Sequence, residues 1–359
     1  MPIHEVGYRA WDGERTSQLS RWWVICETGI RLATKSRWVR RILFVAWLPV
    51  MYWGIGFFFL EKAIEADSNS LYSLIESDAD SFDSIESLHK LKDNSQAAGR
   101  MAIRKSLRER FAMFPHAEDL ATSLESGDPK VIRNDIWRWL LMVFFRYPQS
   151  LLILFLIGSV APSLISRDLR SRAFLLYFSR PIGKLEYLLG KLGIPAAFII
   201  AVSTLPALAL YVFAIMMSPS LSVFWSTWDI PLRILGATVV VVLPMSAISL
   251  MLSSLTQESR FANFSWFAIW ALGHGSWFAI LMATSMGMGK PPFHPDVMAN
   301  NQVQAWSVLS LYNCLGDAQE FIFGFESFED VWRGSVVLAC ITVFSLWILY
   351  RRVSAPVDV

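Results

Sequence analysis

The stretch that decides the fold is ILGATVVVVLPMSAISLMLSSL, residues 234–255, which contains no charged side chain. A helix needs about 20 apolar residues to cross the hydrocarbon core of a bilayer, where every backbone polar group must be paired internally. This segment therefore predicts a membrane-spanning helix. The whole chain agrees, because 54% of its 359 residues are hydrophobic and 17% are charged, a balance more apolar than in a typical soluble domain.

Working outward from this segment, the same pattern recurs along the chain and predicts an all-α, polytopic membrane protein with six transmembrane helices. The second predicted span contains Arg146 and Pro148. An arginine at the centre of a spanning helix costs about 2.5–3.5 kcal/mol, so we expect Arg146 to snorkel to the interface; pairing with a carboxylate or a lipid headgroup is the alternative. The predicted spans are 42–60, 139–165, 192–217, 234–255, 261–289 and 334–350.

The connecting segments differ strongly in charge. Lysine and arginine crowd 31–41, 167–191 and the tail 351–359, whereas 218–231 has neither and 288–332 has only Lys290. Because basic residues in short loops mark the cytoplasmic side, we expect both termini to be cytoplasmic and the membrane to be the plasma (inner) membrane. The expected segments are a cytoplasmic region 1–41 with an interfacial elbow helix, an extracytoplasmic helical loop 61–138 with two amphipathic helices, a cytoplasmic coupling segment 166–191, an extracytoplasmic loop 290–333 and the cytoplasmic tail.

The coupling segment has an unusual pattern for a loop. Asp168 and Arg172 stand at i and i+4, which favours a short amphipathic helix, and Pro181 then disfavours helix at Arg180. Gly183 can begin a new helix in which Glu186 faces the positive end of the helix dipole. Such a helix, joined to two spans, would let a partner push on the membrane domain; the alternative is a basic, lipid-anchoring loop.

The run Ser179-Arg-Pro-Ile-Gly-Lys-Leu-Glu-Tyr-Leu-Leu-Gly-Lys191 resembles the permease subunits of the ABC-2 type transporter family. The resemblance implies that the six helices form half of a dimeric membrane domain, with a second permease subunit as homo- or heterodimer. It also implies that the segment between the second and third spans contacts a separate ABC ATPase subunit. The implied contact residues are Asp168, Arg172, Arg180, Glu186, Tyr187 and Lys191.

An ATPase within these residues would need a phosphate-binding sequence of the form G-x-x-x-x-G-K-[ST], which does not occur. We therefore expect no cofactor in this chain, with ATP and magnesium bound by the partner subunit. The net charge of +2 gives no reason to expect a nucleic-acid partner. Three scattered cysteines offer no disulfide framework or metal spacing, and the methionines around His274 and His294 are better explained by packing than by copper binding, so no metal site is predicted.

Trp266, Trp270, His274 and Trp277 form a stripe along the fifth span. The stripe fits a substrate path or a dimer interface, although packing or interfacial anchoring is the interpretation that we favour. Two other classes of function stay open. One is an intramembrane enzyme using His274 or Ser276, and the other is a non-transporting membrane scaffold whose external loop is a binding module.

Overall fold

The computed structural model describes residues 21–58, 61, 116, 129–173, 182–218 and 220–354. In this part of the chain, six helices are long and apolar enough to cross a membrane, and no strand occurs. The predicted all-α architecture with six spans is thereby confirmed. The six candidate spans are Arg37–Phe58, Arg133–Ser171, Lys184–Met217, Asp229–Leu255, Ser259–Met288 and Phe328–Val353.

Most spans consist of more than one helical element. The first begins with α2 (Arg37–Ala46) and follows the short helix α1 (Arg21–Thr34). The second contains α6 (Pro129–Phe144), the π-helix η3 (Phe145–Gln149), α7 (Ser150–Val160) and α8 (Pro162–Ser171). The third contains α10 (Lys184–Ile199), the π-helix η4 (Ile200–Thr204) and α11 (Leu205–Met217), and the others are α13 (Asp229–Leu255), α14 (Ser259–Met288) and α18 (Phe328–Ser354).

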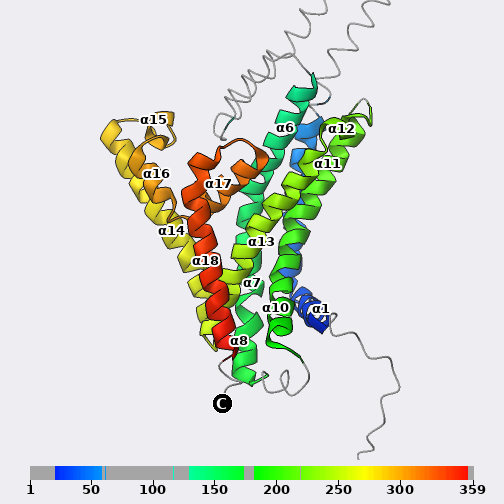
Figure 1. Ribbon diagram of the computed structural model, residues 1–359, viewed down its shortest axis with the longest axis vertical. Helices are drawn as coiled ribbons and strands as arrows, with labels where there is room; N and C mark the ends of the chain where they lie inside the picture. The colour runs from blue at the N-terminus through cyan, green and yellow to red at the C-terminus, as the bar shows by residue number, and fades with distance from the viewer. Residues whose placement is uncertain are drawn as a thin grey trace, which may run out of the picture.

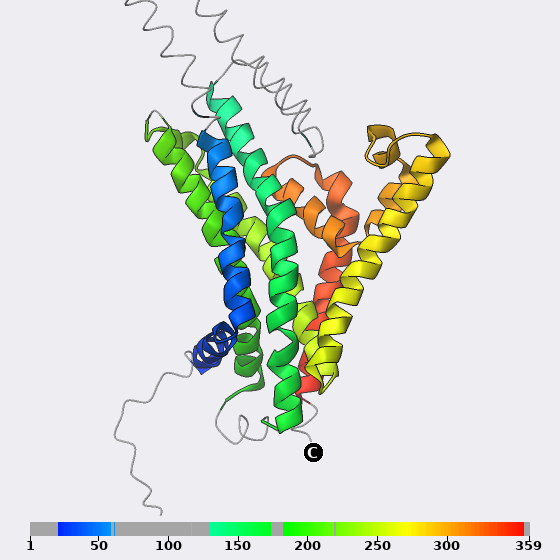
Figure 2. The ribbon, with the colours of Figure 1, turned by 180° about the vertical axis from the view of Figure 1, so that it is seen from behind.

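Helix α13 is the centre of the bundle, where it packs against α8, α10, α14, α17 and α18. Helix α14 leans away from α11, so that their upper ends lie at opposite edges of the molecule (Figure 1). Helix α1, the C-terminal end of α18 and the ends of α8 and α10 all lie at the other end (Figures 1 and 2). We call this the α8–α10 end.

Helix α1 packs tightly against α10 because glycines remove the side chains between them. A Cβ atom on Gly190 would lie 2.8 Å from the carbonyl oxygen of Trp22, and one on Gly193 would lie 2.8 Å from the Cys26 sulfur. A backbone oxygen cannot give way as a side chain can, so Gly190 is required for this approach. The elbow expected over 21–41 thus consists of α1, the turn at Lys35 and the start of α2.

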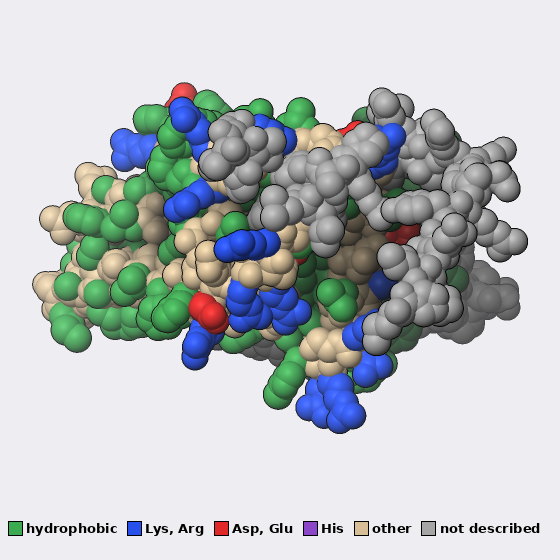
Figure 3. Space-filling view, turned by 90° about the horizontal axis from the view of Figure 1, so that it is seen from below, with side chains coloured by type: hydrophobic (Ala, Val, Ile, Leu, Met, Phe, Trp, Pro, Cys, Tyr) green, Lys and Arg blue, Asp and Glu red, His purple; other side chains and the backbone are tan. Residues whose placement is uncertain are grey.

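The α8–α10 end is strongly basic. Figure 3 views the molecule from this end and shows many Lys and Arg side chains beside few Asp and Glu. Clusters of basic residues beside a membrane are attracted to anionic lipid headgroups. This face is therefore suited to contact such headgroups or an acidic partner. Its exposed basic residues include Arg31, Lys35, Arg37, Arg40, Arg41, Arg167, Arg170, Arg172, Arg260, Arg351 and Arg352.

The segment 290–333, which we expected to be a loop, is largely helical. It contains α15 (Pro295–Met298), α16 (Asn301–Ser307) and α17 (Leu311–Phe323). Helix α17 packs between α13, α14 and α18, and buries one face that includes Leu311, Leu315 and Phe323. It is too short to cross a bilayer, so span length gave no signal for it. The short helix α12 (Val223–Ser226) occupies the other connection on this side.

Candidate coupling cluster and outer cavity

The second and third spans are joined near the α8–α10 end by Asp168, Tyr187 and Lys191, which we call the coupling cluster. The Lys191 ammonium lies 2.7 Å from the Asp168 carboxylate, and the Tyr187 hydroxyl donates to the same carboxylate at 2.7 Å. Lys191 also donates to the carbonyl oxygen of Leu164 at 2.8 Å. Tyr187 is fully buried and Lys191 is buried, so the cluster links α8 and α10 through bonds that water does not weaken.

The other predicted contact residues lie at the surface or outside the described residues. Arg172 is exposed and follows α8 in a left-handed conformation, with φ of +52°. Helix α8 therefore ends there, and Asp168 belongs to the end of the second span instead of starting a separate helix. Glu186 accepts a hydrogen bond from the Gly183 N–H at 2.9 Å and caps α10, as its position predicts. Arg180 lies outside the described residues.

A serine of α13 holds the same end of the second span. The Ser253 hydroxyl donates to the carbonyl oxygen of Pro162 at 2.9 Å and accepts from the N–H groups of Ile165 and Ser166, each at 3.1 Å. Pro162 begins α8, so the hydroxyl binds the backbone at the start of this helix. The ends of α8, α10 and α13 are consequently tied to one another.

The aromatic stripe of α14 contacts the chain's own helices. The Trp266 indole donates to the carbonyl oxygen of Leu154 at 3.0 Å, and His274 Nδ1 lies 3.2 Å from the Ser310 hydroxyl, which caps the start of α17. Trp270 and Trp277 are also buried. The stripe therefore fixes α14 to α7, α16 and α17. Ser276 donates to its own helix at Leu272, so the fold does not pair it with His274.

A second group of charges lies about a third of the way along the second span, and here Arg146 pairs with carboxylates, the alternative to the snorkelling that we expected. The Arg146 guanidinium does not snorkel: it lies 2.7 Å from the Glu320 carboxylate and 3.8 Å from Asp317, both on α17. Its side chain is only 14% exposed. Arginine can stay in an apolar surrounding when an acid neutralises it. We call Arg146, Asp317 and Glu320 the outer ion cluster.

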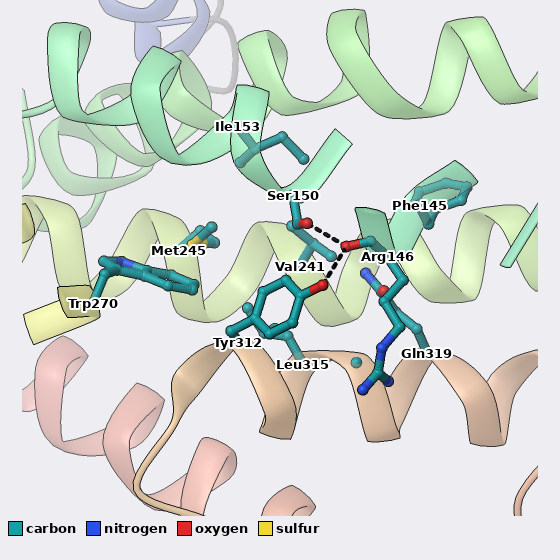
Figure 4. A pocket seen from close by; sticks show the side chains of 11 residues that line it. Phe145, Arg146, Ser150, Ile153, Val241, Met245, Trp270, Tyr312, Leu315 and Gln319 are labelled. Carbon is teal, nitrogen blue, oxygen red and sulfur yellow. Dashed lines mark hydrogen bonds between the residues drawn. The ribbon is translucent and has the colours of Figure 1, made fainter. Parts of the chain in front are cut away.

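The backbone around Arg146 is shaped to present this side chain. Pro148 has no N–H to donate to the preceding turn, and the helix widens into η3 at this point. The carbonyl oxygen of Arg146 accepts hydrogen bonds from Ser150 and from Tyr312, the latter at 3.2 Å, as Figure 4 shows. Opposite, a Cβ atom on Gly316 would lie 2.3 Å from the guanidinium, so this glycine admits the arginine to the surface of α17.

Beside the outer ion cluster lies a cavity of about 510 Å³, the outer cavity. This volume is in the range of small-molecule binding sites. Its wall carries five carboxylates against two guanidinium groups and one imidazole. Helix α17, which carries Asp317, is not one of the spans. Burial raises the pKa of Asp317 to about 6, and the positive charge of Arg146 opposes this rise. The charged lining residues are His116, Arg146, Asp317, Glu320, Glu326, Glu329, Asp330 and Arg333.

Sequence reasoning missed Asp317 and Glu320 because both lie in a segment taken as a loop. A signal was present: Leu311, Leu315, Ala318 and Ile322 recur at helical spacing, which predicts an amphipathic helix with one apolar face. Of the aromatic stripe, only Trp277 is among the residues that line the outer cavity.

The six long apolar helices define an integral membrane protein. The family described as "ABC-2 family transporter protein" matches residues 23–352. The chain therefore belongs to the ABC-2 transporter family and is a membrane permease component of an ABC transporter, as the run 179–191 predicts. No curated protein and no solved structure matches the chain.

Proposed function

We propose that this chain moves its substrate with energy from a separate ABC ATPase subunit, which docks on the basic α8–α10 end. Family membership supports the pairing with an ATPase, and the absence of a phosphate-binding sequence within the 359 residues supports a separate one. ATP and magnesium are then bound by that partner. The single observation that carries the proposed docking place is the coupling cluster, which joins the two spans on either side of the link between α8 and α10.

The coupling cluster explains how docking can act on the membrane domain. A displacement of the link between α8 and α10 moves both helices together, because Asp168 of α8 and Lys191 of α10 form an ion pair of 2.7 Å. Ser253 passes the same displacement to α13, the centre of the bundle. ATP binding then shifts the balance between two arrangements of the spans, provided that the ATPase binds the two arrangements with different affinity.

The proposed orientation places the α8–α10 end in the cytoplasm of a cell whose plasma (inner) membrane holds the protein. The exposed arginines and lysines of this end and the scarcity of basic residues in 218–231 support it. A reporter that is active only in the cytoplasm should give signal when fused after Lys184 and none when fused at Ser222. Signal from the second fusion alone would refute the orientation.

A second permease subunit, identical or homologous, completes the proposed transporter. Large apolar side chains of α14 and α18 are exposed along most of both helices, including Phe264, Leu272, Val343 and Phe344, so a second bundle and lipid can share these faces. Native mass measurement of the complex in lipid discs should give two permease subunits with two ATPase subunits. One permease chain alone with bound ATPase would contradict the dimer.

The docking place is tested by charge reversal at exposed arginines and lysines. Arg172→Glu, beside the link, should reduce co-purification of the ATPase at least several-fold, because it places a repulsive charge in the contact. Lys35→Glu is the matched control, since Lys35 is exposed at the same end in the turn between α1 and α2. Equal loss in both variants would indicate a general effect of charge and would refute docking at the link.

A further inference from the structure

We propose that the outer cavity holds a divalent transition-metal site, with zinc the best-matched ion, formed by His116, Glu320 and Glu326. The His116 Nε2 atom, one Glu320 oxygen and one Glu326 oxygen all lie within 4.8 Å of one another. Imidazole and carboxylate are the donor set of many zinc sites. The inference does not rest on the proposed ATPase partner and departs from the sequence-based expectation of no metal.

The distances between the donor atoms fit a shared ion better than direct contact. His116 Nε2 lies 3.7 Å from a Glu320 oxygen and 3.6 Å from a Glu326 oxygen. A hydrogen bond between nitrogen and oxygen would be about 2.7–3.2 Å long. Around a tetrahedral zinc, with bonds of about 2.0–2.2 Å, neighbouring ligand atoms stand about 3.4 Å apart. The two nitrogen–oxygen distances are close to this value, and the two carboxylate oxygens lie within 4.8 Å of each other.

The surroundings hold two of the ligands in place before any metal binds. The Glu320 Oε1 atom lies 2.7 Å from the Arg146 guanidinium, which leaves Oε2, the oxygen nearer His116, for the ion. The His116 ring stacks on Phe325 with ring centres 5.5 Å apart. Partners that hold a ligand side chain in place fix its orientation toward a metal. The His116 and Glu320 side chains are 12% and 7% exposed, so little ordering is needed.

The charge balance and the geometry of the wall also suit a cation. Two carboxylates and a neutral imidazole carry a charge of −2, which Arg146 offsets only in part. All three ligand residues line the outer cavity, so a fourth position can be filled by water or by a transported molecule. A site with three protein ligands and an open position is the usual arrangement of a zinc that binds a further group.

The ligands come from distant parts of the chain, so no sequence pattern predicts the site. His116 belongs to the segment before the second span, Glu320 to α17 and Glu326 to the turn after it. A bound ion would therefore tie His116 to α17 and to the turn after it. Because α17 contacts α13, α14 and α18, the ion would also add to the stability of the outer half of the bundle.

The test is zinc binding to the purified full-length chain, measured by calorimetry with Zn²⁺ alone. The chain is purified through an affinity tag that contains no histidine. We expect one ion per chain, and His116→Ala and Glu326→Gln should each weaken binding at least about tenfold. Both variants leave the Arg146 pair with Glu320 intact. Co²⁺ in place of zinc should give the visible absorption of a tetrahedral site in the wild type and not in His116→Ala.

The matched control is His294→Ala, because half-buried His294 lies 3.5 Å from Asp296 and could bind zinc away from the proposed site. Retained binding in this variant, together with loss in His116→Ala, supports the site. Unchanged binding in both His116→Ala and Glu326→Gln would overturn it. Zinc should also raise the melting temperature of the wild type more than that of His116→Ala. Equal shifts in the two proteins would overturn the site as well, since His116 would then be only the ion-pair partner of the two glutamates.

Discussion

The coupling cluster and the outer ion cluster both fix the second span to another helix through a buried ion pair, but they differ in how the charges are balanced. In the coupling cluster one ammonium and one hydroxyl meet one carboxylate. In the outer ion cluster one guanidinium meets two carboxylates, beside a cavity with more acids on its wall. A balanced cluster is suited to transmit force, whereas an excess of negative charge at a cavity is suited to bind a cation.

The largest effect should follow from removing the guanidinium of the outer ion cluster. Arg146→Met should lower the free energy of unfolding by about 3–5 kcal/mol, because it leaves buried Glu320 and half-buried Asp317 without their cation. Thermal or denaturant unfolding of the solubilised protein measures this loss. The double variant Arg146→Met, Glu320→Gln should recover part of it, since one unpaired charge is then gone. A double variant as unstable as the sum of the singles would show that the pair itself contributes nothing.

The same substitution in the coupling cluster should cost less. Lys191→Met should lower stability by about 2–3 kcal/mol, since Asp168 keeps the hydrogen bond from Tyr187. It should also reduce transport more than ATP hydrolysis by the partner, because the link would no longer move α8 and α10 together. Tyr187→Phe should cost about 1 kcal/mol and leave transport nearly intact. Equal losses of transport and hydrolysis in Lys191→Met would argue for a structural role alone.

The two clusters also show what the sequence could predict. Tyr187 and Lys191 were singled out because they belong to the run 179–191 that resembles a family, and Asp168 because it lies in the segment that this resemblance implies as the ATPase contact; their mutual contact was not foreseen. The contact depends on α8 extending to Ser171, which places Asp168 opposite Lys191. Periodicity gave the six spans because the bilayer imposes one length and one composition on each.

The outer ion cluster could not be predicted in the same way. Glu320 looked like an acid of an external loop, and Arg146 looked like an interfacial anchor, with an unnamed carboxylate partner as the alternative. Each has an explanation only when the other is placed beside it, and that placement depends on α17 folding back against the spans. The sequence does not predict the role of Gly316 either. A side chain at this position would collide with the Arg146 guanidinium, and that contact is known only from the structure. Such pairing is tertiary information that a local pattern does not contain.

The fold-back of α17 can be tested with two neighbouring glycines of α14. A Cβ atom on Gly273 would lie 2.6 Å from the Leu309 carbonyl oxygen, just before α17, whereas one on Gly275 would meet nothing within 4 Å. Gly273→Ala should therefore destabilise the protein by about 1–3 kcal/mol. Gly275→Ala should be neutral or stabilise by up to about 1 kcal/mol, as alanine favours helix. Equal melting temperatures for the two variants would contradict the close approach of α17 to α14.

The smallest expected effect concerns the acid of the outer ion cluster that lies farther from Arg146. Burial raises the pKa of Asp317 from its ordinary value of 3.8 to about 6. Between these values the folded state binds more protons at this residue than the unfolded state does, so Asp317 destabilises the fold above pH 6 and ceases to do so as the pH falls toward 4. The coupling cluster offers no comparable prediction.

Asparagine at this position removes the titration and serves as the reference. The melting temperature of the wild type relative to Asp317→Asn should rise between pH 7.5 and pH 5, by the equivalent of about 1 kcal/mol once solvent screening is allowed for. Other titrating groups are common to both proteins and largely cancel in the difference. A difference that stays constant, or falls with the pH, would show that Arg146 dominates over burial and that Asp317 is held as a stable carboxylate, which would remove the excess of unpaired charge from the outer ion cluster.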